Sequence, residues 1–481
     1  MCVRTKILYN LYNEISWCIG KTKILRREKM QVAKEIFRQY DIRGVAGETL
    51  TGEVVYHLGK ALGTVYRRFG TESVSLCRDT RFSSPAYRKA LAKGLLESGV
   101  NIYDLGMFPT PFLYFSLFHL PVQGGVMITG SHNPPNENGF KICLGKSTIY
   151  GEQIQELREI MEKEDYVTGR GKKRRVALKE KYLNAVLETL KLPPARQLKV
   201  VVDAGNGVAN ILAVPLYRRM GHQVVELYSR PDGRFPNHHP DPTVPECIES
   251  LKEKVFAAGA DLGMAFDGDG DRLGVIDGRG RILWGDQLMI IFARDILKDR
   301  PGAKFIGEVK CSQHLFDEIA KAGGKPVMWK VGHSLIKAKL KEEEAVMAGE
   351  MSGHLFFADR YYGYDDALYA GARLLEILAG TTESLSSIYD RLPVAINTPE
   401  IRIDCPEEKK TVIVEELARE YRDKYPVVTI DGVRITFPNG WGLLRASNTQ
   451  PVLVMRFEAD TEENLKKIKD QVMGKVRALL T

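Results

Sequence analysis

Three aspartates that alternate with glycines form the segment DGDGDR at positions 267–272. Asp267, Asp269 and Asp271 repel one another unless a cation lies among them, and the glycines let the backbone turn tightly. Carboxylate oxygens are hard ligands that favour Mg²⁺ or Ca²⁺ over zinc. The calcium-binding EF-hand pattern fails, because its conserved glycine and its final glutamate are both missing. The segment predicts a magnesium site with a phosphate oxygen as a further ligand, and the alternative is an acidic surface turn.

A second candidate is the loop TGSHNPPNENGFK at positions 129–141. Pro134 and Pro135 fix their own φ angles and restrict the residues before them, so we expect the loop to be stiff. On a stiff loop the hydroxyl of Ser131, beside His132, can carry a phosphoryl group covalently and divide one transfer into two easier steps. The alternative is that both side chains only satisfy backbone groups, and an isolated Ser-His pair favours that alternative.

Two further segments offer polar groups that suit a phosphorylated ligand. GEMSGH at 349–354 carries Glu350 and Ser352 between glycines and does not fit the GxSxG pattern of serine hydrolases. RASNTQP at 445–451 begins with Arg445, whose guanidinium can bind phosphate through two hydrogen bonds. The neutral donors that follow it are Ser447, Asn448 and Thr449. Each segment is a weak signal alone, since ordinary turns have a similar composition.

The elements that must position these segments alternate between strand and helix. Helices are expected over 51–69, with Thr51 as N-cap, and near 84–98. Strands are expected at 74–77, 101–105, 125–129, 199–203, 224–228, 262–266, 304–309, 326–329 and 344–348. The pattern predicts an α/β protein with three similar βαβ domains, each with a mixed and largely parallel sheet. Three of the segments follow predicted strands, and ligands collect beyond the carboxyl ends of strands in such sheets, so one shared cleft is expected.

The last part of the chain has a different pattern. Strands are expected at 434–437, 442–445 and 452–458, before a final helix whose apolar residues recur at helical spacing from Leu465 to Leu479. Asp460 or Thr461 can cap that helix. This pattern predicts a smaller C-terminal α+β domain. The predicted domains are 30–177 with the serine loop, 178–280 with the aspartates, 281–396 with GEMSGH, and 397–481 with RASNTQP.

Composition excludes several classes of protein. The chain has 481 residues, 44% hydrophobic and 27% charged, which is typical of a globular protein with several domains. No apolar run reaches the ~18–20 residues that a membrane-spanning helix needs. Seven scattered cysteines without a CxxC pair favour a reducing cytoplasm over a disulfide framework or zinc site. The net charge of +8 comes mostly from residues 1–29, and the basic run at 170–175 contains no aromatic residue, so nucleic-acid binding is not predicted.

Taken together and in this order, the four segments resemble those of the α-D-phosphohexomutase family, from about Phe37 to the C-terminus. The subgroup that the sequence resembles most is the bacterial phosphomannomutase/phosphoglucomutase. The resemblance implies four domains around a central cleft. It also implies interconversion of hexose 6-phosphate and hexose 1-phosphate, of mannose or glucose, through a 1,6-bisphosphate that stays bound.

The resemblance further implies roles for individual residues. Ser131 would be phosphorylated, and Asp267, Asp269 and Asp271 would hold one Mg²⁺ together with the serine phosphate. Arg272 would neutralise the transferring phosphoryl group. His132 and Lys141 would act as acid or base beside the reacting hydroxyl. The substrate contacts that it implies are Tyr40, Arg43, Lys310, His333, Glu350, Ser352, Arg445, Ser447, Asn448 and Thr449.

Alternatives remain open. The expected partners are phosphosugars alone, with no nucleic acid and no membrane, bound by a monomer or weak homodimer. Related phosphoglucosamine mutases typically carry glutamine where this chain has Met351, yet that activity stays an alternative. A metal-dependent sugar phosphatase would release inorganic phosphate, and a non-catalytic phosphosugar-binding protein would not need Ser131 as a nucleophile.

Residues 1–29 differ from the rest of the chain. They are basic and lack the clean apolar segment and small-residue cleavage site of a signal peptide. We expect a misassigned start codon or a disordered extension, because terminal segments are often disordered. A shortened chain that begins at Met30 should therefore match the full chain in thermal stability and turnover. Parallel melting curves and kcat measurements test this, and a clear loss in either would show that the segment contributes.

Overall fold

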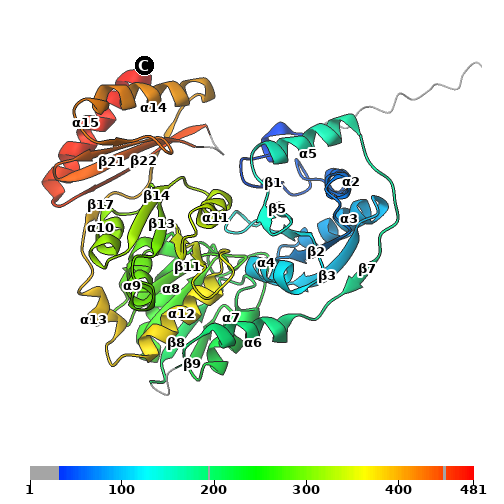
Figure 1. Ribbon diagram of the computed structural model, residues 1–481, viewed down its shortest axis with the longest axis horizontal. Helices are drawn as coiled ribbons and strands as arrows, with labels where there is room; N and C mark the ends of the chain where they lie inside the picture. The colour runs from blue at the N-terminus through cyan, green and yellow to red at the C-terminus, as the bar shows by residue number, and fades with distance from the viewer. Residues whose placement is uncertain (1–31, 193–195, 448–450, 481) are drawn as a thin grey trace, which may run out of the picture.

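The computed structural model describes residues 32–192, 196–447 and 451–480, so residues 1–29, Asn448 and Thr449 lie outside the described residues. Figure 1 shows the chain as an arc of α/β units, with the blue and cyan first unit at the right and the red fourth unit at the upper left. No helix in the described residues is both long and apolar enough to cross a membrane.

The first domain has a mixed sheet with the order β1-β5-β4-β2-β3-β7, and β6 pairs with β5. Helix α2 begins after Thr51, whose hydroxyl accepts a hydrogen bond from the Val54 amide at 3.2 Å, as the predicted cap requires. The elements are η1 (Lys34–Ile36), β1 (Ile42–Val45), α2 (Gly52–Arg68), β2 (Ser73–Arg78), α3 (Ser84–Glu97), β3 (Asn101–Met107), α4 (Thr110–His119), β4 (Gly124–Ile128), β5 (Glu137–Leu144), β6 (Ser147–Thr148), α5 (Glu152–Lys163) and β7 (Lys173–Arg175).

The second domain has the sheet order β12-β11-β10-β8-β9. Strands β8 and β10 are parallel, while β11 returns antiparallel beside β10 after the DGDGDR turn. Because β12 pairs with β11, this sheet continues past the predicted boundary at 280. The elements are α6 (Lys179–Thr189), β8 (Lys199–Asp203), α7 (Asn210–Arg219), β9 (Gln223–Leu227), η2 (Pro245–Ile248), α8 (Glu249–Ala258), β10 (Leu262–Phe266), β11 (Leu273–Asp277) and β12 (Ile282–Leu283).

The third domain has the sheet order β14-β13-β15-β16. The strand expected at 344–348 is wrong at its start: Glu344 has a φ of 52°, in the left-handed region, so the chain is still turning after α11 and β15 begins only at Met347. The elements are α9 (Gly285–Asp299), β13 (Lys304–Glu308), α10 (Gln313–Lys321), β14 (Lys325–Trp329), α11 (His333–Glu342), β15 (Met347–Gly349), β16 (Leu355–Phe357), α12 (Ala367–Ala379) and α13 (Leu385–Tyr389).

The fourth domain has an antiparallel sheet with the order β17-β22-β21-β20-β19, and β18 also pairs with β22. Helix α15 begins after Thr461, whose hydroxyl accepts a hydrogen bond from the Asn464 amide at 3.2 Å. The elements are β17 (Ile396–Asn397), β18 (Ile401–Asp404), α14 (Glu407–Arg422), β19 (Val427–Val428), β20 (Val433–Phe437), β21 (Gly440–Ala446), β22 (Val452–Ala459) and α15 (Glu462–Leu480).

The first three domains share one buried hydrophobic cluster in addition to smaller clusters of their own, whereas the core of the fourth domain is separate. Side chains of α4, α6, α7 and α12 belong to a single buried cluster. The Phe115 ring of α4 lies 5.2 Å from that of Tyr182 in α6, and the Tyr217 hydroxyl donates to the Leu368 carbonyl at 3.0 Å. Apolar residues of β20, β21, β22, α14 and α15 form the separate core of the fourth domain. Because this cluster is shared, it fixes the positions of the first three domains, and so of their strand ends, relative to one another.

Candidate active site

The loops that follow the carboxyl ends of β4, β10 and β15 meet, and each of these strands belongs to a different sheet. Ser131 Oγ, after β4, donates to Asp267 Oδ2, after β10, at 2.6 Å. Arg272 Nε in the second loop lies 3.0 Å from His354 Nε2 in the third. These contacts make one site from segments that lie far apart in the sequence.

Ser131 is held in an unusual backbone conformation. Its φ is 50°, in the left-handed region that side chains other than glycine rarely adopt. The residue is 2% exposed, and its amide donates to the Thr129 hydroxyl at 2.8 Å. Its Oγ lies 3.0 Å from His132 Nδ1. Burial, then the positive charges of Arg272 and Arg43, lower the pKa of His132 well below its usual value, so a neutral imidazole faces the hydroxyl.

The three aspartates are completely buried, and one ligand atom of each lies within 4.8 Å of the others. Burial, with the charges of Asp269 and Asp271, raises the pKa of Asp267 well above the usual range. Burial also acts to raise the pKa of Asp269, but Lys141 and the Thr110 hydroxyl outweigh it, so that pKa is lowered. A buried cluster of this charge requires a compensating cation.

Lys141 is the cation that two of these carboxylates contact. Its Nζ lies 2.9 Å from Asp269 Oδ2 and also contacts Asp271 Oδ2. The expectation that Lys141 belongs to a loop is wrong: the residue lies in β5, which pairs with β4 and β1 and points the side chain at the aspartates. Burial acts to lower the pKa of Lys141, but the aspartates raise it further, so the ammonium stays charged.

The cluster also fits a divalent metal ion. Within the part of the chain that the structure describes, Asp269 Oδ1 and Asp271 Oδ1 are buried and have no hydrogen-bond partner. Buried carboxylate oxygens are rarely left without a partner, and an all-oxygen donor set is the one that Mg²⁺ prefers. The side chains present therefore accommodate the predicted metal.

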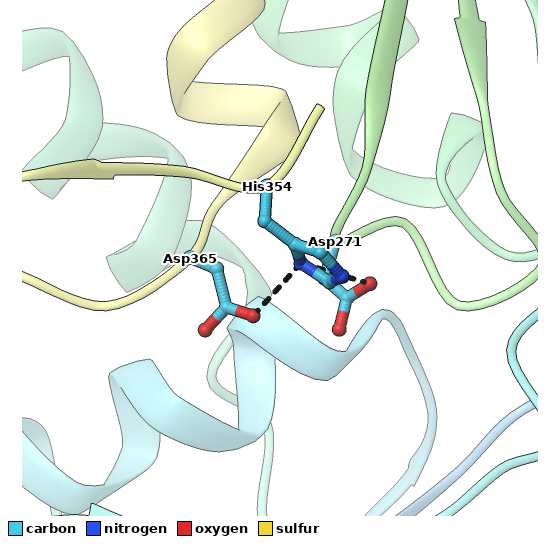
Figure 2. Close-up of side chains that lie close together, drawn as sticks. All are labelled: Asp271, His354 and Asp365. Atoms are coloured by element: carbon cyan, nitrogen blue, oxygen red, sulfur yellow. Dashed lines mark ion pairs between the residues drawn. The ribbon is translucent and has the colours of Figure 1, made fainter. Parts of the chain in front are cut away.

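A second buried group adjoins the aspartates, and sequence reasoning missed it. Figure 2 shows His354 between Asp365 and Asp271, with its Nδ1 3.1 Å from Asp365 Oδ2 and 3.7 Å from Asp271 Oδ1. Lys337 Nζ donates to the other oxygen of Asp365 at 2.9 Å. His354 ends the GEMSGH segment, which gave a signal, whereas Asp365 stands in no motif.

A cavity of about 850 Å³ lies over these loops and is lined by all four domains. The predicted site residues in its lining are Tyr40, His132, Arg272, Lys310, Glu350, Ser352, Arg445 and Ser447. Arg402 and Arg456 of the fourth domain also line it, and no motif had marked them. The lining carries five cationic side chains beside four carboxylates, and these cations offer partners for an anionic ligand.

Glu350 is fixed by the loops around it. Its Oε1 accepts a hydrogen bond from the Gly332 amide at 2.8 Å, and its Oε2 accepts one from the Ser352 hydroxyl at 3.0 Å. The neighbouring Met351 amide donates to Glu308 Oε1 at 3.3 Å. Met351 Sδ contacts the Arg456 guanidinium. The carboxylate and the hydroxyl are thus placed together at the cavity wall.

Arg445 joins the fourth domain to the third and the first. Its Nη2 lies 2.8 Å from Asp431 Oδ2, which also accepts a hydrogen bond from the Val331 amide at 2.9 Å. The Val331 carbonyl accepts one from the Tyr40 hydroxyl at 3.0 Å. Asp431 therefore orients the guanidinium beside the cavity. Asn448 and Thr449 lie outside the described residues.

The remaining predicted residues have different surroundings. Lys310 Nζ reaches Glu400 Oε2 at 3.5 Å across the interface between the third and fourth domains. Arg43 Nη1 donates to the Gly130 carbonyl at 3.3 Å, so it supports the serine loop and is not part of the cavity lining. His333 is also absent from that lining, and its ring stacks on that of His354 with centroids 5.7 Å apart.

Sequence models of four domains match the chain in order. They are described as phosphoglucomutase/phosphomannomutase alpha/beta/alpha domain I over 34–168, domain II over 180–280, domain III over 284–395, and the C-terminal domain over 400–475. The matches together span nearly all of the described chain.

Individual relatives are similar over the same length. A phosphomannomutase/phosphoglucomutase of Pseudomonas aeruginosa is 48% identical over 445 residues, which cover 92% of this chain and 96% of the relative. A phosphoglucomutase of Neisseria gonorrhoeae is 44% identical, with the same coverage of 92% and 96%. The crystal structure of a phosphoglucomutase/phosphomannomutase family protein from Burkholderia thailandensis superimposes with a TM-score of 0.89 at 44% identity, over 93% of this chain and 98% of that one.

Proposed function

The chain belongs to the phosphoglucomutase/phosphomannomutase family, and we propose that this phosphohexomutase interconverts hexose 6-phosphates and hexose 1-phosphates by way of a phosphorylated Ser131. The observation that carries the proposal is the hydroxyl of Ser131. It is buried on a constrained loop, 2.6 Å from a carboxylate and 3.0 Å from a neutral imidazole, below a cavity whose lining includes five cationic side chains. A phosphoryl carrier needs this combination of position, proton acceptor and charge.

In the first half of the proposed cycle, the phosphoryl group passes from Ser131 Oγ to the free hydroxyl of the bound sugar phosphate. The bond from phosphorus to Oγ breaks, the bond to the sugar oxygen forms, and a 1,6-bisphosphate results. The proton that the sugar hydroxyl loses is regained at Ser131 Oγ, and neutral His132 is placed to pass it. Lys141 stays charged beside the aspartates, which supports a role in charge neutralisation rather than as a base.

Asp267, Asp269 and Asp271, with the serine phosphate, would hold one Mg²⁺. When bound, the ion supplies Lewis-acid stabilisation of charge on the phosphoryl oxygens. Arg272 adds a fixed positive charge at the same place, because its amide donates to Asp267 Oδ1 at 3.2 Å and its side chain lies against His354. Most of the rate enhancement in phosphoryl transfer comes from such positioning and charge.

In the second half, the bisphosphate turns so that its other phosphate faces Ser131, which is then phosphorylated again. The two phosphates of the intermediate need two binding sites. The loop at 267–272, called the metal loop below, supplies one of them together with Arg272. Arg445 and Ser447 supply the other, with Asn448 and Thr449 as expected from the sequence. The 850 Å³ cavity leaves room for the intermediate to turn without release.

Assays separate this function from its rivals. A coupled assay with a hexose 1,6-bisphosphate as activator should show turnover, and intact-mass measurement should show a phosphorylated serine. Stoichiometric release of inorganic phosphate, without mutase product, would instead identify a sugar phosphatase. A chain that binds phosphosugars but never becomes phosphorylated would be a binding protein.

We further predict dual specificity for glucose and mannose phosphates. These hexoses differ only at C2, whereas Glu350 and Ser352 are proposed to bind O3 and O4. A site that leaves C2 without a partner discriminates weakly, because an unpaired buried group is worth only about 1–3 kcal/mol. The values of kcat/KM for glucose 1-phosphate and mannose 1-phosphate should therefore agree within about a hundredfold.

Glucosamine 1-phosphate serves as the discriminating substrate in that comparison. Its ammonium adds a positive charge at C2, and the contact of Met351 with the Arg456 guanidinium offers it no acceptor. We expect it to be the poorest of the three. If it exceeded both others by about tenfold, the subgroup assignment would be wrong and the phosphoglucosamine mutase alternative right.

The remaining expectations are also proposals. Phosphosugars are the proposed partners, handled by a monomer or weak homodimer in the cytoplasm. The cavity is lined by the four domains of one chain, so a single chain supplies both proposed phosphate-binding sites.

A further inference from the structure

Arg81 has an extensive set of contacts with the serine loop. It lies between β2 and α3, and its side chain is completely buried. Nη2 donates to the carbonyls of Ser131 at 2.8 Å and Asn133 at 2.6 Å. Nη1 donates to the carbonyl of Glu137 at 2.8 Å and also bonds that of Pro134. One planar guanidinium thus binds carbonyls along the loop from the serine to the start of β5, a geometry that a single ammonium cannot reproduce.

Asp79 completes the attachment from the other side. Its Oδ2 accepts a hydrogen bond from the Gly130 amide at 3.2 Å and lies 3.2 Å from Arg81 Nε. Its Oδ1 accepts hydrogen bonds from the Arg81 amide at 3.0 Å and from the Ser84 hydroxyl at 2.6 Å. The pair therefore binds donors and acceptors of the loop together and compensates the buried charge of the arginine.

Gly130, the residue before Ser131, lies directly against the guanidinium of Arg81. A Cβ added at Gly130 would lie 2.4 Å from Arg81 Cζ, so only glycine allows the guanidinium to approach. The next residue, Ser131, has its φ of 50°. A strained conformation of this kind persists only where the surroundings over-determine it, and the surroundings of Ser131 include the hydrogen bond from Arg81 to its carbonyl.

Residues of the second domain pack against Arg81. The Phe235 ring lies 5.2 Å from Arg81 Cζ, and a Cβ at Gly233 would lie 2.8 Å from Arg81 Cα. The Ser131 carbonyl also touches the metal loop, since a Cβ at Gly268 would lie 2.5 Å from it. Arg81 is thus packed between the serine loop and the domain that carries the aspartates.

We propose that Arg81 is a positioning residue for phosphoryl transfer, which holds Ser131 in its left-handed conformation and aims Oγ at the metal loop. It does not touch substrate and acts through the loop backbone. The inference rests on the proposed function, because it assigns the role relative to a phosphorylated Ser131. The sequence shows Arg81 only as one cation in the segment RDTRF, which fits no pattern that carries chemistry.

The test replaces Arg81 with lysine, which keeps the charge but cannot span the carbonyls. Three quantities are measured: kcat, KM for glucose 1-phosphate, and the rate at which glucose 1,6-bisphosphate phosphorylates Ser131 in the dephosphorylated enzyme, followed by intact mass. In Arg81→Lys, kcat and the phosphorylation rate should fall by on the order of a hundredfold, the effect of misplacing a reacting atom by about 1 Å. KM should change by less than about threefold, because the sugar-binding side chains are untouched.

Arg373→Lys is the matched control. Arg373 is also buried, and its Nη1 lies 2.9 Å from Asp359 Oδ1, but it lies in α12 and does not line the cavity. This substitution should lower the melting temperature and leave kcat of the folded enzyme unchanged. A kcat of Arg81→Lys near that of the wild type, or a loss no larger than in the control, overturns the inference.

A second variant decides the matter if Arg81→Lys does not fold. Phe235→Leu removes the ring over the guanidinium and should reduce the phosphorylation rate by about tenfold with KM unchanged. An unchanged rate in that variant overturns the inference. The proposed function fails separately: a wild-type enzyme that never becomes phosphorylated refutes the phosphoserine, whereas a phosphorylated wild type with unaffected variants refutes only the role of Arg81.

Discussion

Ser131→Ala is expected to lower kcat by on the order of a thousandfold or more, because no other side chain then carries the phosphoryl group between the two halves of the reaction. The loss should fall on kcat rather than KM, since the cavity lining keeps its cations and the proposed sugar contacts. The measurement is a coupled mutase assay with glucose 1-phosphate and its bisphosphate, together with intact mass. The variant should show no phosphorylated form at any bisphosphate concentration.

Ser116→Ala is the matched control for that result. Ser116 is a completely buried serine of α4 whose hydroxyl donates to Ser75 Oγ at 2.7 Å, within the shared core. Its loss should cost about 1 kcal/mol of stability and leave kcat within about twofold of the wild type. Activity of Ser131→Ala near that of the wild type would remove the phosphoserine from the mechanism.

The parts of the fold that follow from local patterns could be predicted from the sequence. The strands expected at 199–203 and 262–266 coincide with β8 and β10, because each is a short buried run bounded by turns. The Thr51 cap and the helix after it were likewise marked by a capping hydroxyl and helical spacing. Where the signal is a period of a few residues, the sequence contains it in full.

Strand β5 shows where local patterns fail. Its residues from Glu137 include Asn138 and Gly139, both poor strand formers, and they follow two prolines, so the segment has the composition of a loop. Pairing with β4 on one side and β1 on the other makes it a strand. The context that overrides propensity comes from distant residues, and with it comes the position of Lys141.

The residues of the candidate site divide in the same way, into those marked by a local motif and those placed by contacts outside any motif. Ser131, the aspartates and Glu350 lie in compact motifs whose residue types indicate their chemistry, although their proposed roles remain predictions. Arg81 binds a carbonyl 50 positions away and Asp431 an amide 100 positions away, while Asp365 contacts His354 from outside the GEMSGH segment, and nothing beside these three residues in the sequence marks a function. A contact between distant residues that serves to orient another side chain leaves no short pattern to find.

Removal of divalent metal should abolish turnover, with a decrease on the order of a thousandfold that added Mg²⁺ reverses. Of the three buried carboxylates, Asp269 and Asp271 contact the Lys141 ammonium, and Asp269 Oδ1 and Asp271 Oδ1 still have no hydrogen-bond partner within the described ranges. The enzyme is treated with EDTA, and activity and thermal stability are followed as Mg²⁺ is returned. Activity that survives EDTA treatment would contradict the assignment.

The same titration should depend on pH in a defined direction. Burial and the neighbouring aspartates raise the pKa of Asp267 well above its usual range, so at acid pH this carboxyl holds a proton that Mg²⁺ must displace. Affinity for Mg²⁺ should therefore rise with pH until Asp267 is ionised and then level off. Asp277→Asn provides the control, because Asp277 is equally buried but accepts hydrogen bonds from Arg279 and Arg281 at the far end of β11. That variant should lose stability and keep its affinity for Mg²⁺, whereas Asp269→Asn should lose the affinity, since an amide in place of the carboxylate removes one of the three charges that attract the ion.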